Sequence, residues 1–187
     1  MKPIKNRWVF LLSVLAGVGV VLCLAAYARW KNPPLRVNDL TQDISVSEQI
    51  KQEAMSQLKD RGFATVIDLR PDGEATDQPT SAAMAAAAKA NDLSFYYIPV
   101  PHGDIPEQSV KQLAEALRDA PKPILMYCRS GRRAARTWSL VEASRQDGMD
   151  ATSIMSAVKE VGQSADDLNQ DIIRRITQRK STSEKKP

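Results

Sequence analysis

A cysteine followed by several arginines is the segment of this chain best suited to chemistry. Residues 128–133 read Cys-Arg-Ser-Gly-Arg-Arg, between an apolar run at 124–127 and a helix-forming run at 132–144. A loop that joins a strand to the start of a helix gathers backbone N–H groups at the positive end of the helix dipole, and it therefore binds anions. The same field, together with the arginines, favours the thiolate form of Cys128. The pattern predicts a nucleophilic thiol in an anion pocket; the alternative is a buried structural cysteine whose neighbouring arginines solvate the helix start.

A carboxyl group that could act beside this thiol lies in the loop 101–106, Pro-His-Gly-Asp-Ile-Pro. If Cys128 attacks a phosphorus centre, the departing oxygen needs a proton, and Asp104 could supply it as a general acid. Asp104 could equally cap the helix that begins at Pro106 or Glu107. His102 could orient the substrate or act as the acid, or it could be an ordinary surface histidine.

The rest of the chain alternates strands with helices in a way that would position these groups. Strands are expected near 44–46, 64–69, 93–100 and 124–127, and helices over 47–61, 81–90, 106–119, 132–144, 153–161 and 164–179. Alternation of this kind predicts an α/β domain with a parallel sheet of four to five strands covered by helices on both faces. Ligands of such sheets bind outside the carboxyl ends of the strands. We therefore expect Asp68 and Arg70, the loop 101–106 and Cys128 to meet at one edge.

The N-terminus differs in composition from everything that follows it. Residues 8–28 contain no charged side chain, and about 20 apolar residues suffice to cross a bilayer. We interpret the segment as a single-pass transmembrane helix that holds the domain in the bacterial periplasm, with a cleaved signal peptide and a periplasmic domain as the alternative. The expected organisation is an anchor at 1–31, a linker at 32–40, the α/β domain at 41–178 and a polar disordered tail at 179–187.

Composition narrows the possible chemistry further. The chain has two cysteines, one of them, Cys23, within the apolar segment, and one histidine, His102. A disulfide within the domain and a structural zinc site are therefore not expected, and neither a metal nor another cofactor is predicted. The net charge of +4 comes largely from the flanks of the apolar segment and from the C-terminus. Because exposed aromatic residues do not accompany these basic residues, nucleic acid is not predicted as a partner.

Three segments taken together resemble a known family. They are residues 66–74 (Val-Ile-Asp-Leu-Arg-Pro-Asp-Gly-Glu), 97–100 (Tyr-Ile-Pro-Val) and 128–133. In this order they resemble the phosphatase-like domain that occurs alone or fused to beta-lactamase-like hydrolases, a relative of the dual-specificity and tyrosine phosphatases. The resemblance extends over about residues 41–162. It implies a cysteine phosphatase-like fold, with Cys128 as nucleophile, an arginine of the loop as phosphate clamp and an aspartate before the loop as acid.

The loop departs from the tyrosine phosphatase pattern in two ways. Its clamp arginine, Arg133, comes one residue early, and Ala134 stands where those phosphatases have a Ser or Thr whose hydroxyl helps the thiolate leave. Thr137 lies one helical turn farther on and is a doubtful substitute. Rhodanese-like sulfurtransferases resemble this shorter loop, which in them stabilises a persulfide on the cysteine.

Three hypotheses therefore follow from the sequence. The first is a phosphatase of the protein-tyrosine or dual-specificity type, acting on a phosphorylated protein or a small phosphomonoester through a cysteinyl-phosphate. The second is a sulfurtransferase that uses a Cys128 persulfide, and the third is a membrane-tethered anion-binding module without catalysis. For the first, the expected catalytic residues are Cys128, Arg133 and Asp104, and the expected substrate-binding residues are Arg129, Ser130, Gly131 and Arg132.

Overall fold

The structure is a computed structural model that describes residues 6–31 and 34–184. The chain divides into two compact units, Met1–Leu35 and Arg36–Pro187. The first contains one helix, α1 (Asn6–Lys31). The elements of the second are β1 (Asn38–Asp39), β2 (Ile44–Ser47), α2 (Ala54–Asp60), β3 (Thr65–Asp68), α3 (Ser81–Ala90), β4 (Ser94–Tyr97), α4 (Glu107–Asp119), β5 (Ile124–Tyr127), α5 (Arg132–Ser144), α6 (Ala151–Glu160), the 3₁₀ turn η1 (Asp166–Leu168) and α7 (Asn169–Glu184).

The second unit is built on a five-stranded sheet with the strand order β1-β2-β5-β3-β4. Strands β2, β5, β3 and β4 run parallel, and β1 pairs antiparallel with β2. The α/β fold expected from the sequence is thus present, but the sheet is mixed rather than purely parallel. In the central strands β3 and β5 every residue is buried, as expected for strands covered on both faces.

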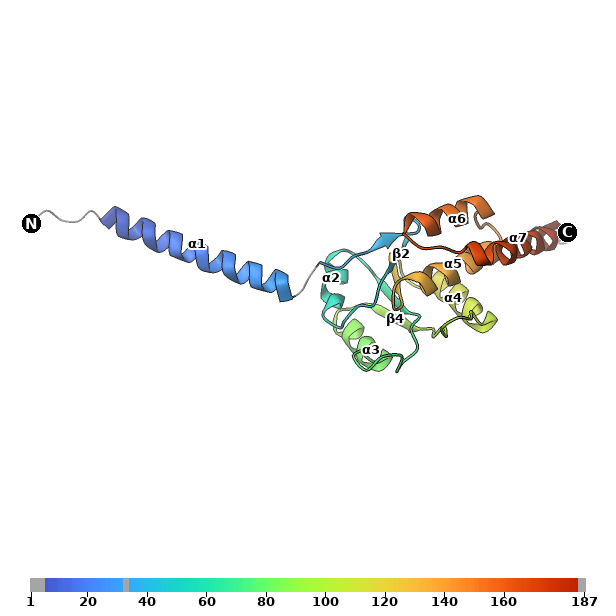
Figure 1. Ribbon diagram of the computed structural model, residues 1–187, viewed down its shortest axis with the longest axis horizontal. Coiled ribbons are helices and arrows are strands. Elements are labelled where there is room, and N and C mark those ends of the chain that lie inside the picture. The colour runs from blue at the N-terminus through green and yellow to red at the C-terminus, as the bar shows by residue number, and fades with distance from the viewer. Residues whose placement is uncertain (1–5, 32–33, 185–187) are drawn as a thin grey trace, which may run out of the picture. The chain divides into compact units, whose positions relative to one another are not determined.

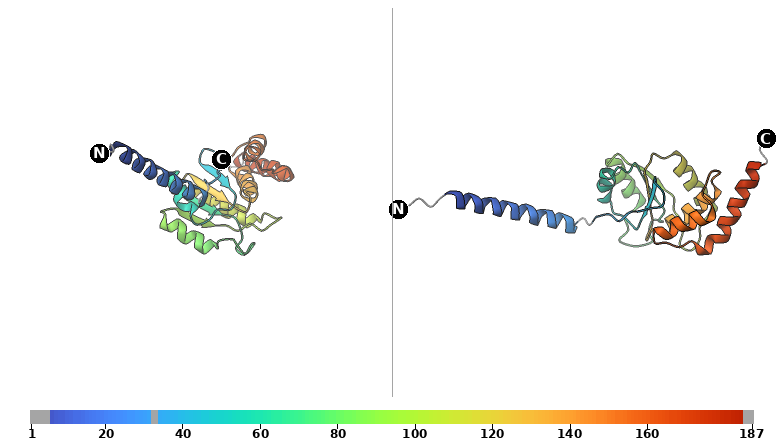
Figure 2. Two further views of the ribbon diagram at one scale, coloured as in Figure 1. Left: turned by 60° about the vertical axis from the view of Figure 1, so that its left-hand side comes forward. Right: turned by 90° about the horizontal axis from the view of Figure 1, so that it is seen from above.

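Helices cover the sheet in two layers. Right-handed crossovers place α2 and α3, which connect β2 to β3 and β3 to β4, on one face, and α4, which returns from β4 to β5, on the other. Helix α5 packs against α4, α6 and α7. Figure 1 shows α3 on one side of the sheet and α5, α6 and α7 on the opposite side, and the two views of Figure 2 agree.

The core lies between these layers and fixes the orientation of the helices. Helix α4 buries Val110, Leu113, Ala116 and Leu117, which recur at the three- and four-residue spacing of one helical face. Trp138 of α5 is fully buried. Each large apolar side chain removed from water contributes about 1.5–3 kcal/mol to stability, so the helix that follows Cys128 is firmly seated.

The C-terminal end of α5 is closed by an arginine from α7. The two Nη atoms of Arg179 donate hydrogen bonds to the carbonyl oxygens of residues 142, 143, 145, 148 and 149 at 2.7–3.3 Å. Carbonyl groups at the end of a helix lack partners within the helix and carry its negative dipole end. Arg179 therefore both caps α5 and holds α7 against it.

Three segments differ from the sequence-based expectations. A helix was expected to begin at Ser47, but this residue pairs with Tyr127 as the last residue of β2, and the helix begins only at Ala54. Strand β1 and the buried Leu40 lie within the stretch 32–40 that was expected to be a linker. Helix α7, expected to end at Arg179, continues to Glu184, and Arg179 itself contacts the end of α5 and the segment that follows it.

The expected transmembrane helix is not found. The segment is helical, as α1, but none of the helices in the described ranges 6–31 and 34–184 is sufficiently long and apolar to cross a membrane.

Candidate active site

The carboxyl ends of the three inner strands carry the candidate site. Ser47 of β2, Asp68 of β3 and Tyr127 of β5 are aligned in the sheet register, and Cys128 follows Tyr127 directly. The loop then turns at Gly131, which has a φ of 80° and is the N-cap residue of α5. A Cβ atom at this position would lie 3.4 Å from the carbonyl oxygen of Ser47. Both the positive φ and the close approach favour glycine at the start of the helix.

Two glutamines from outside the loop hold its carbonyl groups. The backbone N–H of Gln49 donates to the carbonyl oxygen of Arg129 at 3.2 Å, and Nε2 of Gln163 donates to that of Ser130 at 3.0 Å. In a trans peptide the next N–H points away from the carbonyl group. The N–H groups of Ser130 and Gly131 therefore point away from the two glutamines, and no acceptor for them is found in the part of the chain that the structure describes. This geometry can cradle an oxyanion.

Cys128 lies deep in this edge of the domain. Its residue exposure is 1 %, and it belongs to the apolar core cluster. Thr137 does not offer its hydroxyl to the sulfur: its side chain is fully buried and Oγ1 donates to the carbonyl oxygen of Arg133 at 2.8 Å. Thr137 therefore does not replace the hydroxyl that is missing at Ala134.

The guanidinium group of Arg133 is held by Glu74 and by the backbone. Nη1 donates to Oε1 of Glu74 at 2.6 Å and to the carbonyl oxygen of Val100 at 2.7 Å, and Nη2 donates to Oε2 of Glu74 at 2.7 Å. Burial disfavours the charged guanidinium, but the hydrogen bonds to Glu74 and the interaction with the neighbouring Cys128 side chain outweigh it and raise the pKa of Arg133. The same hydrogen bonds lower the pKa of Glu74. Arg133 is thus held charged beside the cysteine.

A count of donors shows what Arg133 can still bind. A guanidinium group carries five N–H bonds, and Glu74 and Val100 accept from both on Nη1 and from one on Nη2. Within the described residues no oxygen accepts from the N–H of Nε or the second N–H of Nη2, which lie side by side on one edge of the group, while the Arg133 side chain is also within hydrogen-bond reach of the Cys128 sulfur. Two adjacent N–H groups fit two oxygens of a tetrahedral anion. Glu74 therefore leaves a complete two-pronged donor available.

Glu74 belongs to the candidate site, although the sequence analysis assigns it no role. Nε of Arg70 donates to its Oε2 at 3.0 Å, and Nη1 of Arg70 donates to Oε1 of Gln49 at 2.9 Å. Arg70 is 6 % exposed, so the network Gln49–Arg70–Glu74–Arg133 has a buried member at its centre. The signal was present in the sequence, because Arg70 and Glu74 both belong to the motif at 66–74.

A cavity of about 490 Å³ brings the Cys128 loop together with the loop 101–106. It is lined by Pro101, His102, Gly103, Asp104, Ile105, Arg129, Ser130, Arg132, Arg133, Arg136 and Asp167. The structure thus gathers the predicted acid with four of the predicted loop residues. Cys128 and Gly131, both buried, are not in the lining.

Asp104 is exposed and free of the capping role considered for it. Its Oδ1 accepts from the N–H of Ile105 at 2.8 Å, whereas the N-cap residue of α4 is Pro106. His102 is also exposed. Gly103 between them has a φ of 93°, which bends the loop so that both neighbours line the cavity.

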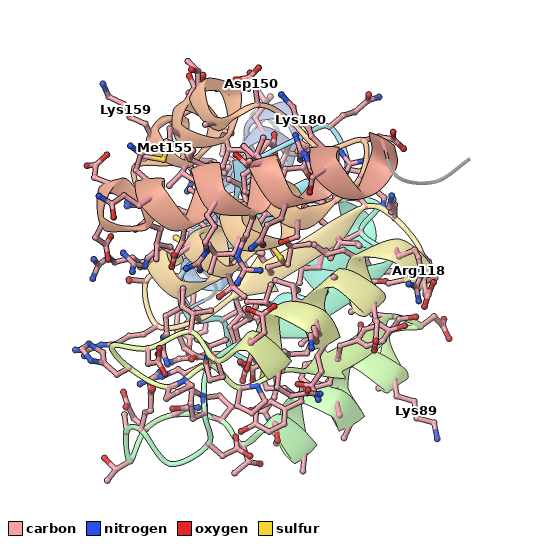
Figure 3. All side chains as sticks on the ribbon, turned by 90° about the vertical axis from the view of Figure 1, so that its right-hand side faces the viewer. Lys89, Arg118, Asp150, Met155, Lys159 and Lys180 are labelled. Carbon is pink, nitrogen blue, oxygen red and sulfur yellow. The ribbon has the colours of Figure 1, made fainter. Side chains whose placement is uncertain are left out.

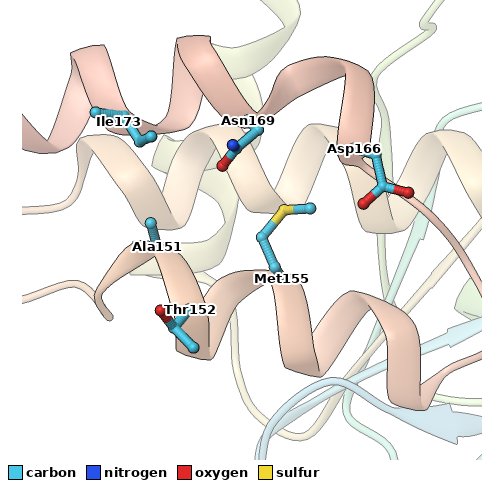
Figure 4. A pocket seen from close by; sticks show the side chains of 6 residues that line it. All are labelled: Ala151, Thr152, Met155, Asp166, Asn169 and Ile173. Carbon is cyan, nitrogen blue, oxygen red and sulfur yellow. The ribbon is translucent and has the colours of Figure 1, made fainter.

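Two other cavities are also present in the domain. One of about 540 Å³ is lined by Gln49, Arg70, Glu74, Ala75, Asp77, His102 and Arg129, so it shares His102 and Arg129 with the first. The other, of about 480 Å³, lies between α6 and the start of α7 (Figure 4). Its lining of Ala151, Thr152, Met155, Asp166, Asn169 and Ile173 contains no strong nucleophile and no cation. The chemistry therefore centres on the Cys128 edge.

Asp68 is a titratable group directly beneath this edge. It is 1 % exposed, and its Oδ1 accepts from the N–H of Arg70 at 2.8 Å. Burial raises its pKa to about 6, although the Arg70 N–H and the Tyr127 hydroxyl act in the opposite direction. Asp68 thus holds the start of the Arg70 turn by a backbone contact; the described residues contain no ion pair between the Asp68 and Arg70 side chains.

Comparisons with known proteins show which family this chain resembles. Residues 35–145 match the model of the beta-lactamase hydrolase-like protein, phosphatase-like domain. The beta-lactamase hydrolase-like protein of Xylella fastidiosa (strain 9a5c) is 31 % identical over 108 residues, which are 58 % of this chain and 25 % of that protein. The chain thus spans about a quarter of the length of this curated relative.

Solved structures share the fold. A phosphatase-like protein (nma1982) from Neisseria meningitidis superposes with a TM-score of 0.65 at 24 % identity, over 74 % of this chain and 96 % of that one. The core catalytic domain of the PP-IP phosphatase SIW14 from S. cerevisiae superposes with a TM-score of 0.57 at 21 % identity, over 83 % and 96 %. The family match covers more than half of the chain and includes every residue of the candidate site up to Arg136. The chain belongs to the family of phosphatase-like domains of beta-lactamase hydrolase-like proteins, as the three motifs predict.

Proposed function

We propose that the chain is a cysteine-dependent phosphatase that acts on a phosphomonoester, either a phosphorylated protein or a small molecule. The observation that carries the proposal is the Nε/Nη2 edge of Arg133, a residue beside Cys128, because no oxygen among the described residues accepts from this edge. A guanidinium edge and converging loop N–H groups stabilise the three non-bridging oxygens of a transferring phosphoryl group.

The reaction would proceed in two balanced steps. The Cys128 thiolate forms a bond to phosphorus while the bond from phosphorus to the leaving oxygen breaks, and Asp104 gives that oxygen its proton. Water then attacks the cysteinyl-phosphate, Asp104 takes up a proton, and thiolate and inorganic phosphate are released. Because Cys128 is 1 % exposed, the phosphoryl group must reach the sulfur through the cavity that the loops 101–106 and 128–133 line.

Arg129, Ser130, Gly131 and Arg132 are the proposed substrate-binding residues. The backbone of Ser130 and Gly131 supplies N–H donors, and the side chains of Arg129 and Arg132 supply positive charge at the cavity. Arg133 is proposed to bind two phosphate oxygens at once, so Arg133→Lys should be costly despite its equal charge.

A second candidate function is sulfur transfer, and one observation favours it: the segment from Cys128 to Arg133 is one residue shorter than the tyrosine phosphatase loop. In this reaction the thiolate takes the outer sulfur of thiosulfate and releases sulfite, and cyanide then removes that sulfur from the persulfide as thiocyanate. Asp104 has no role in these steps.

The two functions are separated by assaying the full chain with an aryl phosphate and with thiosulfate plus cyanide. The proposal expects release of phosphate that Cys128→Ser abolishes, with no comparable thiocyanate formation. Thiocyanate formation without phosphate release would establish the sulfurtransferase. If neither product forms while phosphate still binds, the chain is an anion-binding module.

The cellular location stays a prediction from the sequence. We propose a periplasmic domain, and fractionation of cells that express the full chain tests it: recovery from the cytoplasmic fraction would refute it.

A further inference from the structure

The cavity beside Cys128 contains more positive charge than one phosphate group requires. Four arginines line it, Arg129, Arg132, Arg133 and Arg136, against two aspartates, Asp104 and Asp167. Arg133 is paired with Glu74 and Arg136 with Asp167. Neither Arg129 nor Arg132 forms an ion pair in the ranges that the structure describes, although the charge of Arg132 contributes to lowering the pKa of Asp167, and both side chains are exposed.

Arg136 is the member of this group that the sequence did not single out. It lies one helical turn after Arg132 on α5, so the two side chains occupy the same face of the helix. Asp167, in the turn η1 before α7, accepts hydrogen bonds from both Nη atoms of Arg136, one of them at 2.7 Å. The Arg136 side chain is 12 % exposed, so it is fixed in the cavity wall, and within the described part of the chain no acceptor is found for its Nε–H.

The positions of these arginines separate two tasks. The free edge of Arg133 and the loop N–H groups lie next to Cys128 and suffice for the phosphoryl group that reacts. Arg129, Arg132 and Arg136 surround the same cavity without contributing to that edge. A partly enclosed cavity with unpaired cations binds anions more strongly than an open surface does, because water screens the charges less.

We propose that the substrate carries a second phosphate group close to the one that reacts, and that Arg129, Arg132 and Arg136 bind it. This inference rests on the proposed phosphatase function and narrows its substrate to a small diphosphate or bisphosphate. The three arginines lie within eight consecutive residues, 129–136, around a cavity of about 490 Å³. Two anionic groups bound there must be near neighbours, as in a small diphosphate. A phosphoprotein would present its next charge along an extended chain, farther from the reacting group at about 3.3 Å per residue.

The test compares two phosphonates that phosphatases cannot hydrolyse. Methylphosphonate carries one anionic group, and methylenediphosphonate carries two on the same carbon. Isothermal titration of the full chain at low ionic strength should show at least tenfold tighter binding of the diphosphonate, with a preference that declines as salt is added. Arg132→Gln and Arg136→Gln should each reduce this preference severalfold. Because the Arg132 side chain is exposed, Arg132→Gln should fold normally. It therefore still tests the inference if Arg136→Gln does not fold.

Arg118 supplies the matched control. It is an exposed arginine at the end of α4, labelled in Figure 3, and it is paired with Asp119. Arg118→Gln therefore removes the same charge outside the cavity and should leave the preference unchanged. Equal affinities for the two phosphonates in the wild type would overturn the inference, as would an equal loss of preference in Arg118→Gln. Preference for a singly phosphorylated peptide with acidic neighbours over the diphosphonate would point to a protein substrate and would also overturn it. Failure of the phosphatase proposal is seen separately, as absence of aryl phosphate hydrolysis.

Discussion

Replacing Asp68 by asparagine should stabilise the protein at neutral pH. The carboxyl group is 1 % exposed, and its burial raises its pKa from 3.8 to about 6. Its proton is therefore bound more tightly in the folded chain than in the unfolded one. The stability that this provides is fully present below about pH 4 and is lost as the pH rises through about 6.

The size of the effect follows from the two pKa values. The interval from 3.8 to about 6, at 1.36 kcal/mol per pKa unit, corresponds to about 3 kcal/mol of folding free energy. Asparagine carries no charge at any pH, and its side-chain oxygen can still accept the hydrogen bond from the N–H of Arg70. Relative to wild type, Asp68→Asn should therefore gain up to about 3 kcal/mol between pH 4 and pH 7.5.

Urea unfolding of the full chain at a series of pH values between 4 and 8 measures this difference. Asp60→Asn is the control, because it removes an exposed carboxylate at the end of α2 and should change stability by only a few tenths of a kcal/mol. A difference between Asp68→Asn and wild type that stays constant over this range, or that falls as the pH rises, would refute the reasoning about the buried carboxyl group.

Three further substitutions test separate parts of the account. Arg179→Ala should lower the free energy of unfolding by about 2 kcal/mol or more, because it removes the side-chain donor to five carbonyl groups, two in the last turn of α5 and three in the segment 145–149 that follows it; Arg174→Ala, which breaks an exposed pair, should cost less than about 0.5 kcal/mol in the same urea titration. Glu74→Gln should lower kcat/KM for an aryl phosphate by at least about tenfold while the fold is retained by circular dichroism, since a neutral amide cannot hold both Nη atoms of Arg133; an unchanged value would exclude an orienting role. Asp104→Asn should slow hydrolysis by roughly 10² for esters with poor leaving groups but leave alkylation of the nucleophilic thiol unchanged, and full activity would remove Asp104 from the mechanism.

Much of the fold and the location of the candidate site could be predicted from local sequence. The strand at 124–127, the helix at 132–144 and their joining loop were predicted with their observed bounds, because an apolar run, a glycine and a helix-forming run mark them directly. The parallel order of strands then brought Asp104 and the Cys128 loop to one cavity, since the carboxyl ends of parallel strands share an edge.

The remaining features depend on contacts between segments distant in the sequence. The pairing of Glu74 with Arg133 and of Asp167 with Arg136 joins residues 59 and 31 positions apart, and no local pattern specifies either. Serine is common at the N-cap of helices, which favoured a helix beginning at Ser47, but this residue pairs with β5 and is part of a strand. The antiparallel β1 is two residues long, too short to show an alternating pattern.

Direct detection of a phosphoryl group on Cys128 tests the central claim most closely. The full chain would be mixed with a ³²P-labelled phosphomonoester, quenched during turnover and digested, and the labelled peptide identified by mass spectrometry. The account predicts label on the peptide that contains Cys128 and none in Cys128→Ser. Phosphate release by Cys128→Ser at the wild-type rate, or label on a different residue, would contradict it.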